Sequence, residues 1–336
     1  MRLGDPRVRK TLYWLLGIGL LAWIAREADL GAVLARAREI GVGGMAVVLA
    51  IYLAAFVIDT WTWQMTLPSL PLDARSLYRL WKVRMVGEAV NATTPAAGLG
   101  GEPVKAVLLK RHCGIGYREG TASLVLARTI NILALLLFLT GGYLLVLRAP
   151  DLPAGFRAVA GAGLAVSVAG GLALWALQRF RITSLAGTFA AGFPAARRIE
   201  RVLGHVRDVD DLLVAFYTLR RGRFAAATAL AFVNWWLGAV EVWFVLRALG
   251  HPLPLGDAWI IESAAQLVRL GAFFIPASLG AQEGAFFLVG EALAGSATLG
   301  VAVGLVRRFR ELLWILWGFA LAAWLGRRGA GAASAS

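Results

Sequence analysis

Carboxylates stand at two places where the sequence is apolar and is broken by glycine and proline. Glu102 lies seven positions after Pro95, and Glu283 lies seven positions after Pro276. In both stretches the proline is followed by alanine and then by glycine-containing residues. If these stretches lie inside a membrane, their irregular backbone must be buried in protein or line a polar cavity. The pattern therefore indicates a site for a polar ligand.

Arginines follow each of these carboxylates within the next long apolar stretch. Arg128 lies 26 positions after Glu102, and three arginines at 307, 308 and 310 lie 24, 25 and 27 positions after Glu283. An arginine at the centre of a bilayer costs at least about 2.5–3.5 kcal/mol unless it is paired or hydrated. Two interpretations stay open, and both can hold: a cationic site for a lipid phosphate, and Arg–Glu pairs that join helices. The expected partners of the arginines are Glu88, Glu102, Glu262 and Glu283.

The residues that we expect to bind the lipid lie in and around these two broken stretches. We predict no catalytic residue and no metal ligand among them. They are Arg84, Glu88, Asn91, Pro95, Gly100, Gly101, Glu102, Lys105, Arg128, Glu262, Arg269, Pro276, Gly280, Gln282, Glu283 and Arg308.

The composition predicts an integral membrane protein. Of the 336 residues 59% are hydrophobic and 16% are charged, and the mean hydropathy is +0.69. Soluble domains are closer to half apolar and a quarter charged. The runs at 41–67, 158–177 and 224–246 hold at most one charge each and are long enough to cross a bilayer. The net charge of +14 lies largely in the loops between such runs, which fits membrane topology and anionic lipid better than nucleic acid.

Other kinds of chemistry find little support in the residues. Cys113 is the only cysteine, and the three histidines are scattered without ligand spacing. The sequence shows no nucleophile–base pair and no nucleotide-binding loop. We therefore expect no cofactor and no metal, and the residues leave enzymatic activity open without favouring it.

The expected fold is all-α and polytopic. Six spans are predicted at about 11–25, 42–67, 119–147, 156–178, 224–248 and 299–326, with re-entrant hairpins at 85–111 and 259–296. With this topology 23 of the lysines and arginines lie on one side and 6 on the other. Such a bias predicts both termini in the cytoplasm, in a bacterial inner membrane. Residues 1–328 are expected to form one domain, and 329–336 a disordered tail.

The topology makes two parts of the chain an inverted pair. Units at 42–147 and 224–326 each contain a span, a broken region and a second span, and the second unit runs in the opposite direction. Broken segments at matching positions of inverted halves indicate a transport site near the membrane midplane. The helix N-termini after each break would present free N–H groups to an anionic headgroup.

The stretch GEAVNATTPAAGLGGEPVKAVLL, at 87–109, resembles the lysylphosphatidylglycerol synthase transmembrane-region family, which is also called flippase-like. PASLGAQEG, at 276–284, resembles the second signature of that family, and GEAVN is similar to its hopanoid-biosynthesis-associated branch. The resemblance implies a lipid-translocating or lipid-binding membrane core. The best-understood members add a cytosolic aminoacyl-transfer domain, which these 336 residues do not contain. Lys105 stands where the family often has arginine.

Three functions remain open on these grounds. The first is a flippase-like transporter of a polar or anionic lipid, such as a phospholipid, a polyprenyl-linked precursor or a hopanoid. The second is a membrane subunit of an enzyme that modifies lipid headgroups, with paired carboxylates for acid–base chemistry. The third is an accessory scaffold for lipid or hopanoid biosynthesis. Membrane lipids are the expected partners, with lipid-biosynthesis proteins as further partners and no nucleic acid.

Overall fold

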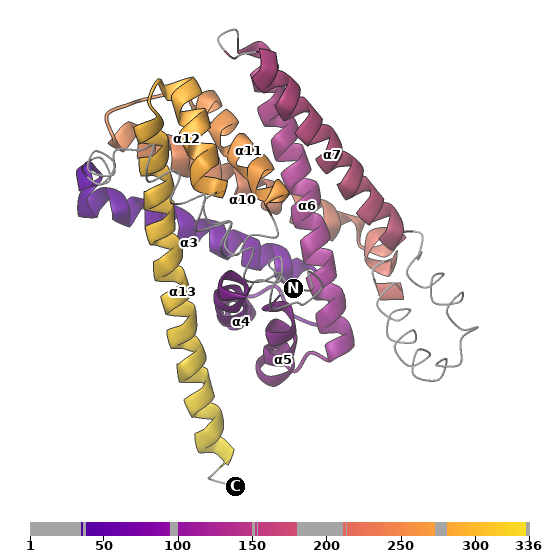
Figure 1. Ribbon diagram of the computed structural model, residues 1–336. Helices are drawn as coiled ribbons and strands as arrows, with labels where there is room; N and C mark the ends of the chain where they lie inside the picture. The colour runs from indigo at the N-terminus through magenta and orange to yellow at the C-terminus, as the bar shows by residue number, and fades with distance from the viewer. Residues whose placement is uncertain are drawn as a thin grey trace, which may run out of the picture.

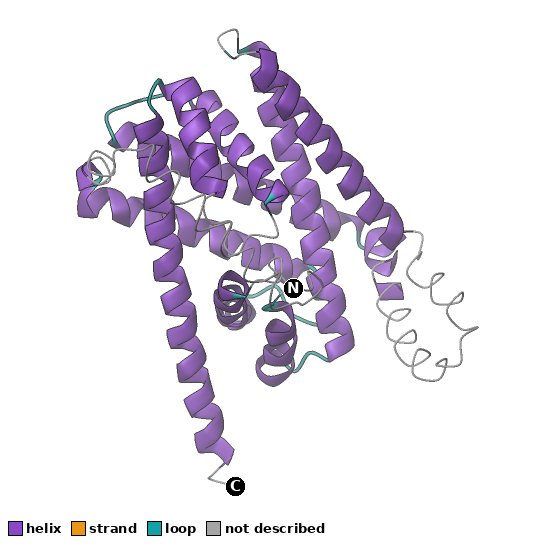
Figure 2. Cartoon of the chain, in the orientation of Figure 1, coloured by secondary structure: helices purple, strands orange, loops and turns teal. Residues whose placement is uncertain are grey.

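The computed structural model describes residues 35, 38–94, 100–149, 152, 154–179, 211–212, 214–272 and 281–333. Every regular element in these ranges is an α-helix, and short loops join most of them (Figure 2). The helices are α3 (Gly41–Met65), α4 (Ala74–Thr93), α5 (Glu102–Cys113), α6 (Tyr117–Arg148), α7 (Ala154–Arg179), α10 (Arg221–Ala248), α11 (Leu255–Gly271), α12 (Ala281–Ala294) and α13 (Ala297–Ala333).

Four of the described helices are long and apolar enough to cross a membrane. They are α3, α6, α10 and, over Ala154–Ala176, α7. They match four of the expected spans to within a few residues at each end. The expected span at 299–326 lies inside α13, which is one continuous helix. The expected span at 11–25 falls outside the described residues.

Both expected broken regions are interrupted between two helices. In the first, α4 ends at Thr93 and α5 begins at Glu102. In the second, α11 ends at Gly271 and α12 begins at Ala281. Local signals account for the described ends of the first pair. The Asp73 side chain accepts a hydrogen bond from the backbone N–H of Ser76 at the start of α4, which holds the pKa of Asp73 below its usual value.

The end of α5 has its own signal. Gly114 takes a left-handed conformation there, with φ of 72°, which stops the helix before α6.

The helices of the first and second halves pack against one another (Figure 1). The two apolar helices α3 and α10 lie together at the centre, and α6 packs on the other side of α10. Helix α4 packs on α13, and α11 packs on α6. Helix α7 runs beside α6, and α12 runs beside α13 (Figure 1). The core is therefore built by helices from both halves of the chain.

Helices α12 and α13 approach each other closely at Gly290 and Gly300. A Cβ atom added at Gly300 would lie 1.8 Å from the carbonyl oxygen of Phe286 and 3.2 Å from the Cα of Gly290. Small residues allow helices to approach in this way inside membranes.

We expect Gly300→Ala to lower the free energy of unfolding by about 1–3 kcal/mol, because the added methyl group meets backbone that cannot move aside. A melting curve of the purified protein in detergent measures the effect. Gly170→Ala on α7 is the matched control, since a Cβ there meets nothing within 4 Å. Equal melting temperatures for Gly300→Ala and the wild type would contradict the close approach.

Candidate functional site

The first break brings Lys105 of α5 against two carboxylates. The Lys105 Nζ lies 2.7 Å from Glu88 Oε1 and 2.8 Å from Glu102 Oε1. The lysine side chain is 7% exposed, whereas Glu88 is 35% and Glu102 is 28% exposed. Two half-buried carboxylates thus share one buried cation, and the cluster has a net charge of −1. Its acidic edge is the part that a ligand can reach.

Asn91 and Gly101 fix the geometry of this cluster. The Gly101 N–H donates to Asn91 Oδ1 at 2.6 Å, and Asn91 Nδ2 lies 3.4 Å from oxygens of both Glu88 and Glu102. A Cβ atom at Gly101 would lie 2.0 Å from the carbonyl oxygen of Gly87. Glycine at this position therefore lets α5 begin directly against α4. The expected residues Glu88, Asn91, Gly101, Glu102 and Lys105 are brought together.

A second ion pair lies one turn earlier on α4. Arg84 forms a salt bridge with Asp59 of α3, and Asn131 of α6 donates a hydrogen bond of 2.8 Å to the other Asp59 oxygen. This accounts for Asp59, the one charge in an otherwise apolar span. The Arg84 Nε–H is buried and has no hydrogen-bond acceptor among the described residues. The contacts of Asp59 with Arg84 and Asn131 therefore join α3, α4 and α6, and one N–H group of Arg84 remains without an acceptor in the described structure.

The largest buried cluster lies in the second half of the chain. Arg307 of α13 lies 2.7 Å from Glu262 of α11 and 3.5 Å from Glu241 of α10. Arg310, one turn further along α13, forms a salt bridge with Glu241. All four side chains are at most 7% exposed, and their charges balance.

Neutral groups add two hydrogen bonds to this cluster. The carbonyl of Gly238 accepts from Arg307 at 3.0 Å, and Gln266 donates to Glu262 at 2.8 Å. The interpretation of Arg–Glu pairs that join helices is thus supported for Arg307. Sequence reasoning noted Glu241 as a lone charge in a span but did not place it in the site, because a single acidic residue does not reveal its partner.

An aromatic column on α3 connects the two halves. The Tyr52 ring carries the Arg310 guanidinium at 3.8 Å, and the Phe56 ring carries that of Arg84 at 4.8 Å. Such contacts stabilise a cation where water is scarce. Tyr52, Phe56 and Asp59 are spaced four and then three positions apart, so they share one face of the helix. This spacing is the signal that could have found Tyr52.

Arginines from both halves of the chain therefore lie on neighbouring rings of α3. The centres of the Tyr52 and Phe56 rings are 6.5 Å apart, and they carry Arg310 of the second half and Arg84 of the first half.

Two expected arginines are exposed. Arg128 on α6 and Arg269 at the end of α11 both lie at the surface of the described structure. Three of the four expected glutamate partners pair elsewhere, since Glu88 and Glu102 pair with Lys105 and Glu262 pairs with Arg307. The side chain of the fourth, Glu283, lies outside the description, so the pairing of Arg128 stays a prediction. Its part in a lipid site stays a prediction.

The remaining expected residues are placed only in part. Arg308 pairs with Glu311 at 2.9 Å, one turn along α13. Gly100 lies in the turn before α5, and Gln282 and Glu283 lie in the first turn of α12. Pro95, Pro276 and Gly280 fall outside the described residues, so their expected roles stay predictions.

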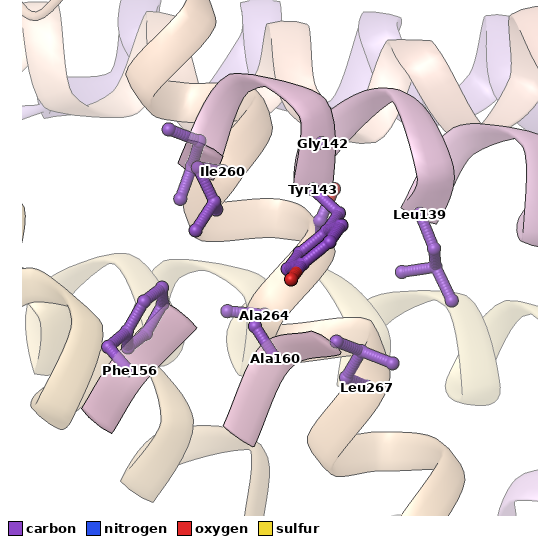
Figure 3. Close-up of a pocket in the computed structure, with 10 residues that line it drawn as sticks. Leu139, Gly142, Tyr143, Phe156, Ala160, Ile260, Ala264 and Leu267 are labelled. Carbon is purple, nitrogen blue, oxygen red and sulfur yellow. The ribbon is translucent and has the colours of Figure 1, made fainter. Parts of the chain in front are cut away.

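Apolar side chains surround a small space between α6, α7 and α11. Figure 3 shows Tyr143 of α6 near Ala160 and Ala264, with Phe156 and Leu267 close by. The volume open to a water-sized molecule is about 20 Å³, which holds no more than about one water. This space is a packing gap and not a substrate pocket.

The helices and their buried ion clusters define a multi-pass integral membrane protein with polar groups enclosed at helix breaks. Within that class the chain belongs to the lysylphosphatidylglycerol synthase TM region family, whose model matches residues 12–318. Membership links the protein to lipid handling in the membrane. Comparisons with curated proteins and with solved structures returned no match.

Proposed function

We propose that this protein moves a polar lipid between the leaflets of the membrane and binds the headgroup beside Tyr52. The observation that carries the proposal is the placement of Arg84 from the first half and Arg310 from the second on the neighbouring rings of Phe56 and Tyr52, within a helical membrane domain. Buried ionisable groups in membrane helices are costly and typically mark a path for a polar substrate. The same arrangement of charged groups also suits a protein that binds the polar lipid without moving it.

The packing of the helices supports an inverted repeat of 42–147 and 224–326. Helix α3 corresponds to α10 in this scheme, α4 to α11, α5 to α12 and α6 to α13. The first helices of the two units pack on each other, α4 packs on the last helix of the second unit, and α11 packs on the last helix of the first. Reciprocal contacts of this kind are what a two-fold relation between the units produces. The distribution of lysine and arginine favours a bacterial inner membrane with both termini in the cytoplasm.

The groups near Tyr52 suit a headgroup with a phosphate and a hydroxyl or ammonium group. The Nε–H groups of Arg84 and Arg310 have no acceptor among the described residues, and because both atoms are buried, a phosphate that entered between the helices would be needed to accept from them. The exposed Arg269 adds a cation. The half-buried carboxylates of Glu88 and Glu102 accept hydrogen bonds from hydroxyl or ammonium groups.

A translocation assay in proteoliposomes tests the proposal. Purified protein is reconstituted with fluorescent phosphatidylglycerol or phosphatidylethanolamine, and an impermeant quencher reports the movement of the headgroup. We expect wild-type protein to move at least one of these lipids much faster than protein-free vesicles. The Glu88→Gln/Glu102→Gln variant should lower the rate at least about tenfold, since two charge-assisted hydrogen bonds to the headgroup are weakened.

The exposed residue Glu291 on α12 supplies the control, and Glu291→Gln should leave the rate unchanged. Wild-type rates equal to those of empty vesicles would reject the proposal. A change in the mass of the lipid on incubation with purified protein would point instead to an enzyme that modifies headgroups.

A further inference from the structure

Helices α4 and α5 form an antiparallel pair whose open end lies away from the first break. The two helices lie side by side (Figure 1), and Leu80 and Val83 of α4 share a buried apolar cluster with Leu109 of α5. The beginning of α4 and the last turn of α5 therefore meet at this open end. Arg79 of α4 and Arg111 of α5 are exposed there.

Three cations lie on one face of α4 near this end. Arg75, Arg79 and Lys82 are spaced four and then three positions apart. Like charges at this spacing destabilise a helix, and a cation near the N-terminus opposes the positive end of the helix dipole. The first turn of α4 holds no acidic residue that would offset them. This face is therefore unfavourable unless an anion lies beside it.

Two aromatic rings hold Lys82 in place. Its Nζ lies 4.5 Å from the centre of the Tyr78 ring and 5.9 Å from that of the Trp324 ring on α13. These cation–π contacts position the ammonium group, and they leave its N–H groups able to donate to an anion. Tyrosine and tryptophan are also typical of the level of lipid headgroups in a membrane.

The positive charge at this end is not balanced by the described residues. None of their carboxylates forms a salt bridge with these cations of α4 or with Arg111. Asp73 caps α4, where it accepts a hydrogen bond of 2.7 Å from the Ser76 N–H. On α5, burial lowers the pKa of His112, and the charges of Lys82 and Arg111 lower it further. A lowered histidine pKa is expected beside cations that have no counter-charge.

The two longest stretches outside the description do not supply a net negative charge. Residues 1–34 carry five lysines and arginines against three acidic residues, and residues 180–210 carry the same numbers. A counter-charge for this end is therefore expected from another molecule.

We infer that Arg79, Lys82 and Arg111 bind a phosphate group at the open end of the α4–α5 pair. Three cations around one point match the charge and the several acceptor oxygens of a phosphomonoester better than the single charge of a carboxylate. The site is separate from the proposed headgroup site, because Arg84, two positions after Lys82, pairs with Asp59 of α3 instead. The phosphate belongs either to a lipid at the membrane surface or to a soluble phosphate ester, and binding measurements distinguish these two sources.

Binding to the full-length protein in detergent tests this inference. Native mass spectrometry compares dioleoyl phosphatidic acid with dioleoylglycerol, which has the same chains without the phosphate. Isothermal titration calorimetry measures glycerol 3-phosphate, which has the phosphate without the chains. We expect the wild type to favour phosphatidic acid over dioleoylglycerol, or to bind glycerol 3-phosphate. Arg79→Gln/Arg111→Gln should weaken that binding at least about tenfold, since two charge-assisted hydrogen bonds are lost.

Two further variants separate a site from general attraction by charge. Lys82→Gln should weaken the binding about threefold or more, because it removes the cation between the two rings. Arg220→Gln/Arg221→Gln removes two exposed charges at the start of α10 and should leave the binding within about twofold of wild type.

A phosphatidic acid preference that is lost in Arg79→Gln/Arg111→Gln assigns a lipid phosphate to the site, and lost binding of glycerol 3-phosphate assigns a soluble one. No preference and no binding in the wild type would overturn the site. So would equal losses in Arg79→Gln/Arg111→Gln and Arg220→Gln/Arg221→Gln, or no loss in the first. These results are independent of transport, so the phosphate site stands or fails separately from headgroup translocation.

Discussion

The Glu241→Gln variant is expected to lose about 3–5 kcal/mol of its free energy of unfolding, the usual cost of removing one partner from a buried ion pair. Glu241 pairs with both Arg307 and Arg310, and all three side chains are buried. The amide keeps the size of the side chain but removes its charge, so two arginines are left with only the carboxylate of Glu262. Reversible unfolding of the purified protein in mixed detergent and SDS measures the loss.

A second variant separates charge imbalance from simple loss of packing. If unpaired charge is the cause, Glu241→Gln/Arg310→Gln should be more stable than the sum of the two single losses predicts, because each residue is costly mainly without its partner. Glu291→Gln on the exposed side of α12 should stay within about 0.5 kcal/mol of wild type. Additive losses in the double variant would show that the ion pair is not the source of the stability.

The Lys105→Met variant is expected to lower headgroup translocation more than tenfold while the protein still folds. Methionine fills the space along Gly87, where the Lys105 side chain now packs, but it leaves Glu88 and Glu102 without their cation. Two carboxylates in this position repel each other, and the N-terminus of α5 should move away from α4. The rate in proteoliposomes measures the effect, and size-exclusion chromatography confirms the folded state.

Arginine at the same position should restore part of the rate, because it keeps the charge and changes only its geometry. The matched control is Lys110→Met on the same helix, since Lys110 is exposed and contacts only the Tyr117 ring in the described structure. A normal rate in Lys105→Met, with the protein folded, would remove Lys105 and its carboxylates from the proposed path.

The apolar runs and their interruptions predicted the helices well. The ends of α3, α6, α7 and α10 lie within about three residues of the expected ones, because runs of this length are dictated by the hydrocarbon thickness. The broken stretch around Pro95 and Glu102 contains residues that lie together at the first break, although the cation between Glu88 and Glu102 is Lys105 and not an arginine. Lys105 lies one turn after Glu102 on α5, and Glu88 lies on the neighbouring helix α4. Spacing along the chain can suggest contacts of this local kind.

Long-range partners could not be predicted in the same way. Asp59 pairs with Arg84, and Glu241 pairs with residues nearly 70 positions away, because the rotation of one helix against another decides which charges meet. Arg128 shows the converse, since it lies on the expected helix α6 but its side chain is exposed in the described structure. Periodicity within one helix gives the depth of a residue, whereas its neighbours follow from the packing of all the helices.

The most direct test of a single shared site is the coupling between Glu88, beside the first break, and Arg269, beside the second. Headgroup translocation is measured for wild type, Glu88→Gln, Arg269→Gln and the double variant. If both residues act on one headgroup near Tyr52, each single variant should slow translocation, and the double variant should be no slower than the worse single variant. Losses that multiply in the double variant, or a wild-type rate equal to that of empty vesicles, would contradict the account.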